Sequence, residues 1–254
     1  MTTDELVARL RAAGCVFAED EAAVLLESTT DATELERFVQ LRERGLPLEH
    51  IVGWADFAGV RVLVEPGVFV PRPRTELLVD EAVSQLHPGA TVLDLCCGSG
   101  AVGLAIAARV RVTLSAAELD PVAVATARRN LVPLGATVYE GDLYEPLPAA
   151  LRGSIDLITV IAPYVPTDAI ALLPHEARDF EPILSLDGGS DGLDLVRRIV
   201  AEAPLWLAHG GRLVTEVSED QAPVVVELAH VAGLSARIAG DEETDSWVVV
   251  VTRD

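Results

Sequence analysis

The segment Val92-Leu-Asp-Leu-Cys-Cys-Gly-Ser-Gly-Ala-Val-Gly103 decides the fold. Its first residues are mostly apolar, as in a buried strand, and a glycine-rich turn follows at once. Gly98 and Gly100 have no Cβ atom, so the backbone there can turn sharply and approach a ligand closely. The helix expected from Ala101 would present unpaired N–H groups in its first turn. The segment therefore predicts a strand, a ligand-binding turn and a helix, in that order.

The chain beyond this segment alternates strands and helices. Strands are predicted at Thr91–Leu95, Val112–Ala117, Thr137–Tyr139, Asp156–Ile161, Gly211–Glu216 and Trp247–Thr252. Helices are predicted between them at Ala101–Arg109, Pro121–Leu131, Gly192–Trp206 and Gln221–Gly233. This alternation is typical of a mainly parallel sheet that is covered by helices on both faces. The predicted fold class is therefore α/β, with a Rossmann-like sheet.

The residues before this region have a different pattern. Residues 1–48 are predicted to form a small helical domain, because apolar residues recur there at helical spacing. Residues 49–70 are predicted to form a connecting β-hairpin and linker, and residues 71–254 the main domain. The N-terminal helices concentrate no reactive side chains, so we interpret them as an accessory bundle that could dock a substrate.

The chain is strongly acidic, with a formal net charge of −21. A nucleic-acid backbone is neutralised by clustered cations, so this charge argues against DNA or RNA as a partner. All 19 basic residues are arginine, and two explanations of the composition stay open. One is a functional acidic surface, and the other is solubility or a general bias toward acidic, arginine-rich proteins.

The sequence lacks the patterns of a membrane span, a signal peptide and a metal site. No apolar run reaches the roughly 20 residues that span a bilayer, and the N-terminus lacks the pattern of a signal peptide. We therefore expect a cytoplasmic protein with no membrane partner. The adjacent Cys96 and Cys97 lack C-x-x-C spacing, and the five histidines lie far apart. No metal site is predicted.

Three acidic residues are predicted near the carboxyl ends of neighbouring strands, where ligands bind in open α/β sheets. Asp94 lies near the end of the first strand, four residues before Gly98, where its carboxylate could orient the turn or meet an ammonium group. Glu118 ends the second strand and suits hydrogen bonds to two ribose hydroxyls. Asp142 could accept from an adenine amino group, with Leu143 packed on the ring. Taken alone, Asp94 is better explained as a turn cap, Glu118 as a surface acid and Asp142 as the start of a loop, but together the three residues predict a nucleoside cofactor.

Two nucleoside cofactors fit this spacing. Gly98, Gly100 and Gly103 form G-x-G-x-x-G, so the glycines do not exclude a dinucleotide such as NAD. Asp94 would lie close to an anionic pyrophosphate, however, and the turn contains no arginine. S-adenosylmethionine has no phosphate and carries a positive sulfonium, so an acidic turn favours it. The residues predicted to bind it are Asp94, Cys96, Cys97, Gly98, Ser99, Gly100, Glu118, Leu119, Asp142, Leu143 and Ile161.

Three further segments resemble the bacterial methyltransferases that modify the glutamine amide in the Gly-Gly-Gln motif of peptide-chain release factors (the PrmC/HemK group). Pro47-Leu-Glu-His-Ile-Val-Gly-Trp-Ala-Asp-Phe57 is similar to that family's inter-domain hairpin. Phe69-Val-Pro-Arg-Pro-Arg-Thr-Glu76 is similar to its proline-arginine signature. Phe180-Glu-Pro-Ile-Leu-Ser-Leu-Asp-Gly-Gly-Ser-Asp-Gly-Leu193 is similar to the loop after its substrate motif. The resemblance covers nearly the whole chain and implies a class I methyltransferase that uses S-adenosylmethionine, with a protein substrate and a release factor as partner.

The substrate motif departs from the family pattern. The resemblance places Ile161-Ala162-Pro163-Tyr164 where the family has Asn-Pro-Pro-Tyr, whose asparagine and following backbone hold the glutamine amide. These four positions are the candidate catalytic residues. Pro163 and Tyr164 imply a fixed loop and an aromatic wall, or simply a rigid strand end. Ile161 has no side-chain hydrogen-bonding group, so a bound amide would leave polar groups unpaired, at about 1–3 kcal/mol per group.

Several interpretations of this departure stay open. The chain could methylate weakly, or act on a different acceptor that backbone groups hold. It could also bind the cofactor without catalysis, as a binding module, or carry Ile161 as an introduced substitution. A nucleic-acid adenine methyltransferase shares the Asn-Pro-Pro-Tyr type of motif, although the net charge argues against it. Arg72 and Arg74 either bind substrate backbone or form structural salt bridges.

Overall fold

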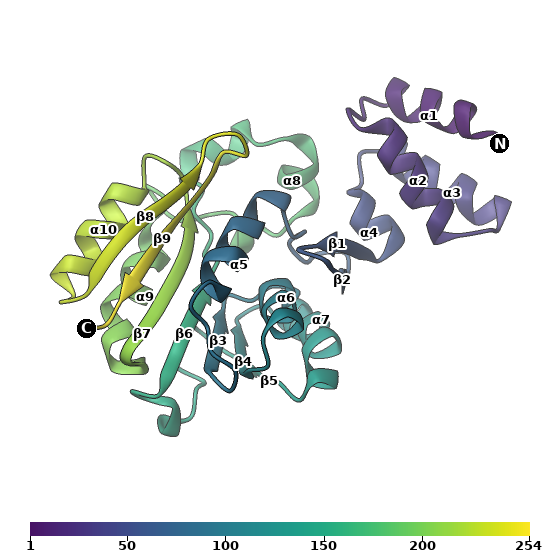
Figure 1. Cartoon of the computed structure of the whole chain (residues 1–254). Helices are drawn as coiled ribbons and strands as arrows, with labels where there is room; N and C mark the ends of the chain where they lie inside the picture. Colours follow the sequence, from purple (N-terminus) through teal and green to yellow (C-terminus); the bar gives the residue numbers. More distant parts are fainter.

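The computed structural model describes all 254 residues and contains one large sheet of seven strands (Figure 1). In spatial order the strands are β5 (Thr137–Glu140), β4 (Thr113–Glu118), β3 (Thr91–Leu95), β6 (Ile155–Val160), β7 (Leu207–Val217), β9 (Ser246–Thr252) and β8 (Ser235–Asp241). The strands from β5 to β7 are parallel, and β9 is antiparallel to both of its neighbours. The predicted α/β fold with a mainly parallel, Rossmann-like sheet is confirmed.

The strand order reverses at the centre of the sheet. From β3 the chain adds β4 and β5 on one side, and then β6 and β7 on the other. Open α/β sheets bind ligands at such a switch point, beyond the carboxyl ends of the two strands beside it. Here those strands are β3 and β6, which end at Leu95 and Val160 and pair in register there. The glycine turn and the segment from Ile161 therefore begin side by side.

Helices cover both faces of the sheet. The helices on one face are α5 (Glu76–Val83), α6 (Ala101–Arg109) and α7 (Pro121–Leu131), and those on the other are α9 (Asp194–Trp206) and α10 (Ala222–Val231). Successive residues of a strand point to opposite faces, so Val92 packs in the first of these cores and Leu93 in the second. Near the cavity are α8 (His175–Phe180) and the 3-10 helices η1 (Pro73–Thr75), η4 (Thr167–Leu172) and η5 (Ile183–Ser185), and elsewhere η2 (Val132–Leu134) and η3 (Ala149–Leu151).

The N-terminal helices form a separate bundle, joined to the sheet by a hairpin (Figure 1). The bundle contains α1 (Thr3–Ala12), α2 (Ala18–Ser28), α3 (Ala32–Glu43) and α4 (Leu48–Val52), and the hairpin contains β1 (Trp54–Phe57) and β2 (Val60–Leu63). The bundle has a separate hydrophobic core, in which Leu6, Leu25 and Phe38 are buried together. The division at residues 48 and 70 stays a prediction, and α4 spans both sides of the first boundary.

Arg42 connects this bundle to the main part of the chain. Its guanidinium is buried and pairs with Glu21 of α2 at 2.6 Å and with Glu176 of α8 at 2.6 Å. Arg42 Nη1 also donates a hydrogen bond of 3.2 Å to the carbonyl oxygen of Leu46. A buried charge needs partners of this kind, so the contact fixes the bundle against α8. None of the helices combines the length and apolar composition needed to cross a membrane.

Candidate active site

Two glycines of the turn after β3, Gly98 and Gly100, have left-handed backbone conformations. Gly98 has φ +55° and an added Cβ would meet nothing within 4 Å, so its missing side chain leaves space in the cavity described below. Gly100 has φ +80° and an added Cβ would lie 2.8 Å from Leu131 Cδ1 of α7. Gly98 therefore faces the cavity, whereas Gly100 permits α7 to pack against the turn.

Asp94 connects the end of β3 to the first turn of α6 and to β6. Its side chain is buried, Oδ2 accepts a hydrogen bond of 2.9 Å from the Gly103 N–H, and Oδ1 accepts one of 3.0 Å from the Thr159 hydroxyl. Burial raises the pKa of Asp94 to about 7, although both hydrogen bonds oppose that shift. Of the two predicted roles, these contacts match orientation of the turn. Asp94 does not line the cavity.

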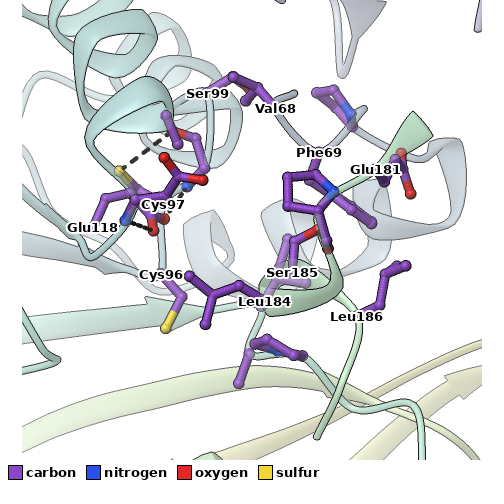
Figure 2. A pocket seen from close by; sticks show the side chains of 18 of the residues that line it. Val68, Phe69, Cys96, Cys97, Ser99, Glu118, Glu181, Leu184, Ser185 and Leu186 are labelled. Carbon is purple, nitrogen blue, oxygen red and sulfur yellow. Dashed lines mark hydrogen bonds between the residues drawn. The ribbon is translucent and has the colours of Figure 1, made fainter. Parts of the chain in front are cut away.

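Glu118 links the turn to the end of the next strand. One carboxylate oxygen accepts a hydrogen bond of 2.8 Å from the Gly98 N–H. The other accepts from the N–H groups of Leu119, at 2.8 Å, and Asp120, at 3.0 Å. A carboxylate offers about four lone-pair positions, so one stays free for a ligand hydroxyl. Figure 2 shows Glu118 beside Cys97 and Ser99 at one end of the cavity.

Asp142 has a cationic partner that sequence reasoning missed. Its Oδ2 accepts a hydrogen bond of 2.6 Å from Nη2 of Arg198, which comes from α9 and also lines the cavity. Leu143 follows with φ +48° and is buried at the same end. The strand pattern gave no signal for Arg198, because Arg198 lies 56 residues after Asp142 in the chain. The second oxygen of Asp142 is left for a ligand.

Asn130 also acts on the turn and was not predicted. From α7, its amide nitrogen donates to the carbonyl oxygens of Ser99 at 2.8 Å and Leu63 at 2.9 Å. Its amide oxygen accepts from the Leu63 N–H at 3.0 Å. The Asn130 side chain therefore satisfies both backbone groups of Leu63 in the hairpin and connects the hairpin to the glycine turn through Ser99. An asparagine in an amphipathic helix carries no sequence signal for such a role.

A single cavity of about 570 Å³ joins the predicted cofactor residues to the predicted acceptor residues. The predicted residues that line it are Cys96, Cys97, Gly98, Ser99, Glu118, Leu119, Asp142, Leu143, Ile161, Ala162, Pro163 and Tyr164. Asp94 and Gly100 lie behind its wall. Figure 2 shows Phe69 of the linker and Glu181 and Leu186, which follow α8 in the chain, away from Glu118, whereas Leu184 of η5 lies nearer Cys96. The glycine turn, the Ile161–Tyr164 segment, the linker and the segment after α8 therefore all contribute to the cavity wall.

The acceptor side of the cavity is mostly apolar. Ile161 lines it and also packs against the core formed with α5, α6 and α7. Tyr164 places its ring in the wall, and its hydroxyl donates to Glu216 Oε1 at 2.9 Å. Burial, and then the charge of Glu216, raises the pKa of Tyr164 well above its ordinary value. The Tyr164 hydroxyl therefore stays protonated and acts as a fixed hydrogen-bonding group.

Two arginines of the linker are bound to buried carboxylates. Arg72 donates to Glu181 Oε1 at 2.6 Å, and the Val70 N–H donates to the same oxygen at 3.1 Å. Arg74 donates to the Tyr164 hydroxyl at 2.6 Å and lies 3.4 Å from Glu216 Oε1. Their contacts are those of structural salt bridges, although both arginines also line the cavity. Glu181 and Glu216 each keep one buried oxygen without a partner.

Solved structures place this fold in a known class. A methyltransferase from Pyrococcus furiosus matches with a TM-score of 0.58 and 17% identity, over 76% of this chain and 88% of that one. The E. cuniculi Mtq2-Trm112 complex, responsible for the methylation of the eRF1 translation termination factor, matches with a TM-score of 0.53 and 21% identity, over 73% and 97%. Both likenesses concern the fold alone. The fold is that of the class I methyltransferases.

Sequence comparison identifies the family. Residues 92–180 match the methyltransferase domain family. Release factor glutamine methyltransferases are 40% identical in Geobacter sulfurreducens (74% of this chain, 66% of the relative) and 39% identical in Mycolicibacterium smegmatis (76% and 69%). The one from Moorella thermoacetica is 33% identical over 90% of this chain and 88% of the relative. The chain belongs to the release factor glutamine methyltransferase family, which confirms the resemblance.

Proposed function

We propose that this protein binds S-adenosylmethionine and transfers its methyl group to the side-chain amide of a glutamine in a release factor, slowly because of Ile161. The observation that carries the proposal is the single cavity, which the glycine turn and the Ile161–Tyr164 segment line together. A methyl donor and an acceptor held together in one cavity gain rate from proximity and orientation.

The cofactor end of the cavity fits S-adenosylmethionine. Gly98 leaves open space where a Cβ would stand, Glu118 keeps one lone-pair position for a ligand hydroxyl, and Asp142 keeps one carboxylate oxygen for a hydroxyl or amino group. Leu143 offers an apolar surface at the same end. The cationic group near this end, Arg198, is already paired with Asp142, so no free charge is offered to a pyrophosphate. When bound, S-adenosylmethionine supplies a methyl group on a positive sulfonium.

The acceptor end can orient an amide only through its backbone. The Ile161 side chain is apolar, whereas Pro163 restricts the backbone and Tyr164 forms one wall. The amide nitrogen would attack the methyl carbon in line as the bond from that carbon to the sulfonium breaks. The sulfur would keep the electron pair and leave as neutral S-adenosylhomocysteine, and the proton that the nitrogen loses would pass to solvent. Without an asparagine, the planar amide loses one pair of hydrogen bonds and part of its alignment, which lowers the rate.

Ile161 also favours a second candidate function. A chain that binds the cofactor and the release factor but transfers no methyl group would act as a binding module. The two candidates share the fold, the cavity and the cofactor. They differ only in whether a methyl group appears on the acceptor.

Calorimetry and a transfer assay separate these functions. We expect S-adenosylhomocysteine to bind and to raise the melting temperature. With labelled cofactor, we expect slow labelling of a release factor that carries Gly-Gly-Gln, and none of its Gln→Ala variant. Binding of both molecules without labelling would favour the binding module. Absence of heat and of thermal stabilisation at saturating ligand would exclude both functions.

A further inference from the structure

Gln221 holds the backbone of the acceptor segment. It lies at the start of α10 and is buried, and its Nε2 donates to the carbonyl oxygen of Tyr164 at 2.9 Å and to that of Asp191 at 3.0 Å. Its Oε1 accepts from the Ser218 N–H at 3.1 Å. Both amide hydrogens are therefore used, one on each of two segments that line or support the cavity.

Two glycines permit this close approach. A Cβ added to Gly192 would lie 2.1 Å from the carbonyl oxygen of Tyr164 and 2.4 Å from Gln221 Nε2. A Cβ added to Gly188 would lie 2.6 Å from the carbonyl oxygen of Pro163. Any larger residue would have to push the acceptor segment away. The glycine-rich loop after η5 is thus shaped around the backbone of Pro163 and Tyr164.

Backbone hydrogen bonds complete the contact. The Val165 N–H donates to Leu186 at 3.1 Å, and the Gly188 N–H donates back to Val165 at 2.9 Å. The Thr167 N–H then donates to Gly189 at 2.9 Å. The loop and the acceptor segment form a short parallel bridge, with Gln221 beside it. Three independent kinds of contact therefore fix the same few residues.

We propose that Gln221 is a positioning residue for methyl transfer, acting through the backbone of Tyr164. This inference rests on the proposed function. Because Ile161 offers no polar side chain, the acceptor depends on backbone groups of this segment, and misplacement of such groups by about 1 Å can cost a hundred-fold in rate. Gln221 is far from the cofactor residues in sequence and is not among the residues that line the cavity. It should therefore affect the acceptor without affecting the cofactor.

The test uses Gln221→Met, which keeps the length of the side chain but removes both donors. Gln85→Met is the matched control, because Gln85 is exposed on the surface. Amide hydrogen exchange of Val165, Thr167 and Gly188 is measured by NMR, with and without S-adenosylhomocysteine. We expect exchange at these amides to be at least about ten-fold faster in Gln221→Met, with no change at the amides of α6. Gln85→Met should match the unaltered protein.

A kinetic measurement adds the functional readout. In Gln221→Met we expect kcat/KM for the release factor to fall about ten- to a hundred-fold, and the Kd for S-adenosylhomocysteine to change less than about two-fold. Unchanged exchange at Val165 and Gly188 would overturn the inference. So would an equal loss of cofactor affinity, because that is the result of general destabilisation. If the unaltered protein labels no release factor, the proposed function fails, and the exchange data still decide whether Gln221 fixes the segment.

Discussion

Arg74 Nη2 lies 2.6 Å from the phenolic oxygen of Tyr164, although 90 residues separate them in the chain. Tyr164 in turn donates to Glu216 at 2.9 Å, so the linker, the acceptor segment and the end of β7 meet at one hydroxyl. The resemblance to the glutamine methyltransferases gives Arg74 and Tyr164 as two separate motifs. Their contact shows that the proline-arginine linker supports the aromatic wall of the cavity.

The first prediction concerns this hydroxyl. Tyr164→Phe removes it and leaves the buried Glu216 without one of its donors, so we expect the free energy of unfolding to fall by about 1–2 kcal/mol. The released ring should also lower kcat/KM for the acceptor by about ten-fold. Tyr139→Phe, on β5, is the matched control. Chemical denaturation and the transfer assay check both effects, and a Tyr164→Phe protein that resembles the control in both would contradict this role.

The main features of the fold could be predicted because they depend on local pattern. Buried parallel strands are continuous apolar runs, and the helices between them have apolar faces, so most of the elements could be placed. Strand β8 was missed because it is an edge strand whose residues are mostly exposed or half-buried, without clear alternation. The antiparallel return of β9 depends on pairing between distant strands, which no local pattern encodes.

The site was predictable only where residues follow strand ends. Glu118 and Asp142 could be found because topology brings strand ends together. Asn130, Arg198 and Gln221 could not, since each acts from a helix through a contact with a distant segment. Asp94 was predicted to bind the cofactor, whereas the structure places it behind the cavity wall, because its side chain is buried against Gly103 and Thr159.

Glu118 gives the second prediction. Glu118→Gln keeps the shape but loses the charge and replaces one acceptor oxygen with an NH2 donor, so either the Gly98 N–H or the N–H groups of Leu119 and Asp120 lose their acceptor. We expect the Kd for S-adenosylhomocysteine to rise about ten- to a hundred-fold by calorimetry. Glu140→Gln is the matched control, because Glu140 pairs in register with Glu118 but lies outside the cavity lining. Equal affinities for the two variants would rule out a direct role for Glu118.

Asp94 gives a prediction about pH. Its folded pKa of about 7 is higher than that of an unfolded aspartate, so between the two values the folded protein holds a proton that the unfolded chain releases. The contribution of Asp94 to the free energy of unfolding is therefore fully present at low pH and is lost as the pH rises toward 7. Asp94→Asn does not titrate, and its amide can still bond to Gly103 and Thr159.

The measurement compares unfolding free energies between pH 5 and 8. We expect Asp94→Asn to gain on the unaltered protein as pH rises to about 7, by at most about 1.4 kcal/mol per pH unit, and the gain to level off above that pH. Asp156→Asn, a carboxylate that accepts from the Thr91 N–H at the start of β3, is the control. A difference between Asp94→Asn and the unaltered protein that stays constant across this range would refute the raised pKa.

Arg42 gives a prediction about the bundle. Arg42→Met leaves the carboxylates of Glu21 and Glu176 without their cation, and Glu21 is largely buried. We expect the free energy of unfolding to fall by about 3 kcal/mol, because an unpaired buried charge is costly. The control is Arg37→Met, since Arg37 is exposed and its carboxylate partner is 3.8 Å away. Denaturant titration decides, and similar midpoints for the two variants would show that Arg42 is not a structural link.

The most direct test of the account is Ile161→Asn, measured beside the unaltered protein with labelled S-adenosylmethionine and a release factor carrying Gly-Gly-Gln. Glu118 and Asp142, which offer the polar groups at the cofactor end, are unchanged by this substitution, so the Kd for S-adenosylhomocysteine should stay within about two-fold, although Ile161 is itself one of the predicted cofactor residues. An asparagine restores hydrogen bonds to the amide worth about 1–3 kcal/mol, so methyl transfer should be about ten- to a hundred-fold faster than in the unaltered protein. Equal or slower transfer by the Ile161→Asn protein would contradict the account.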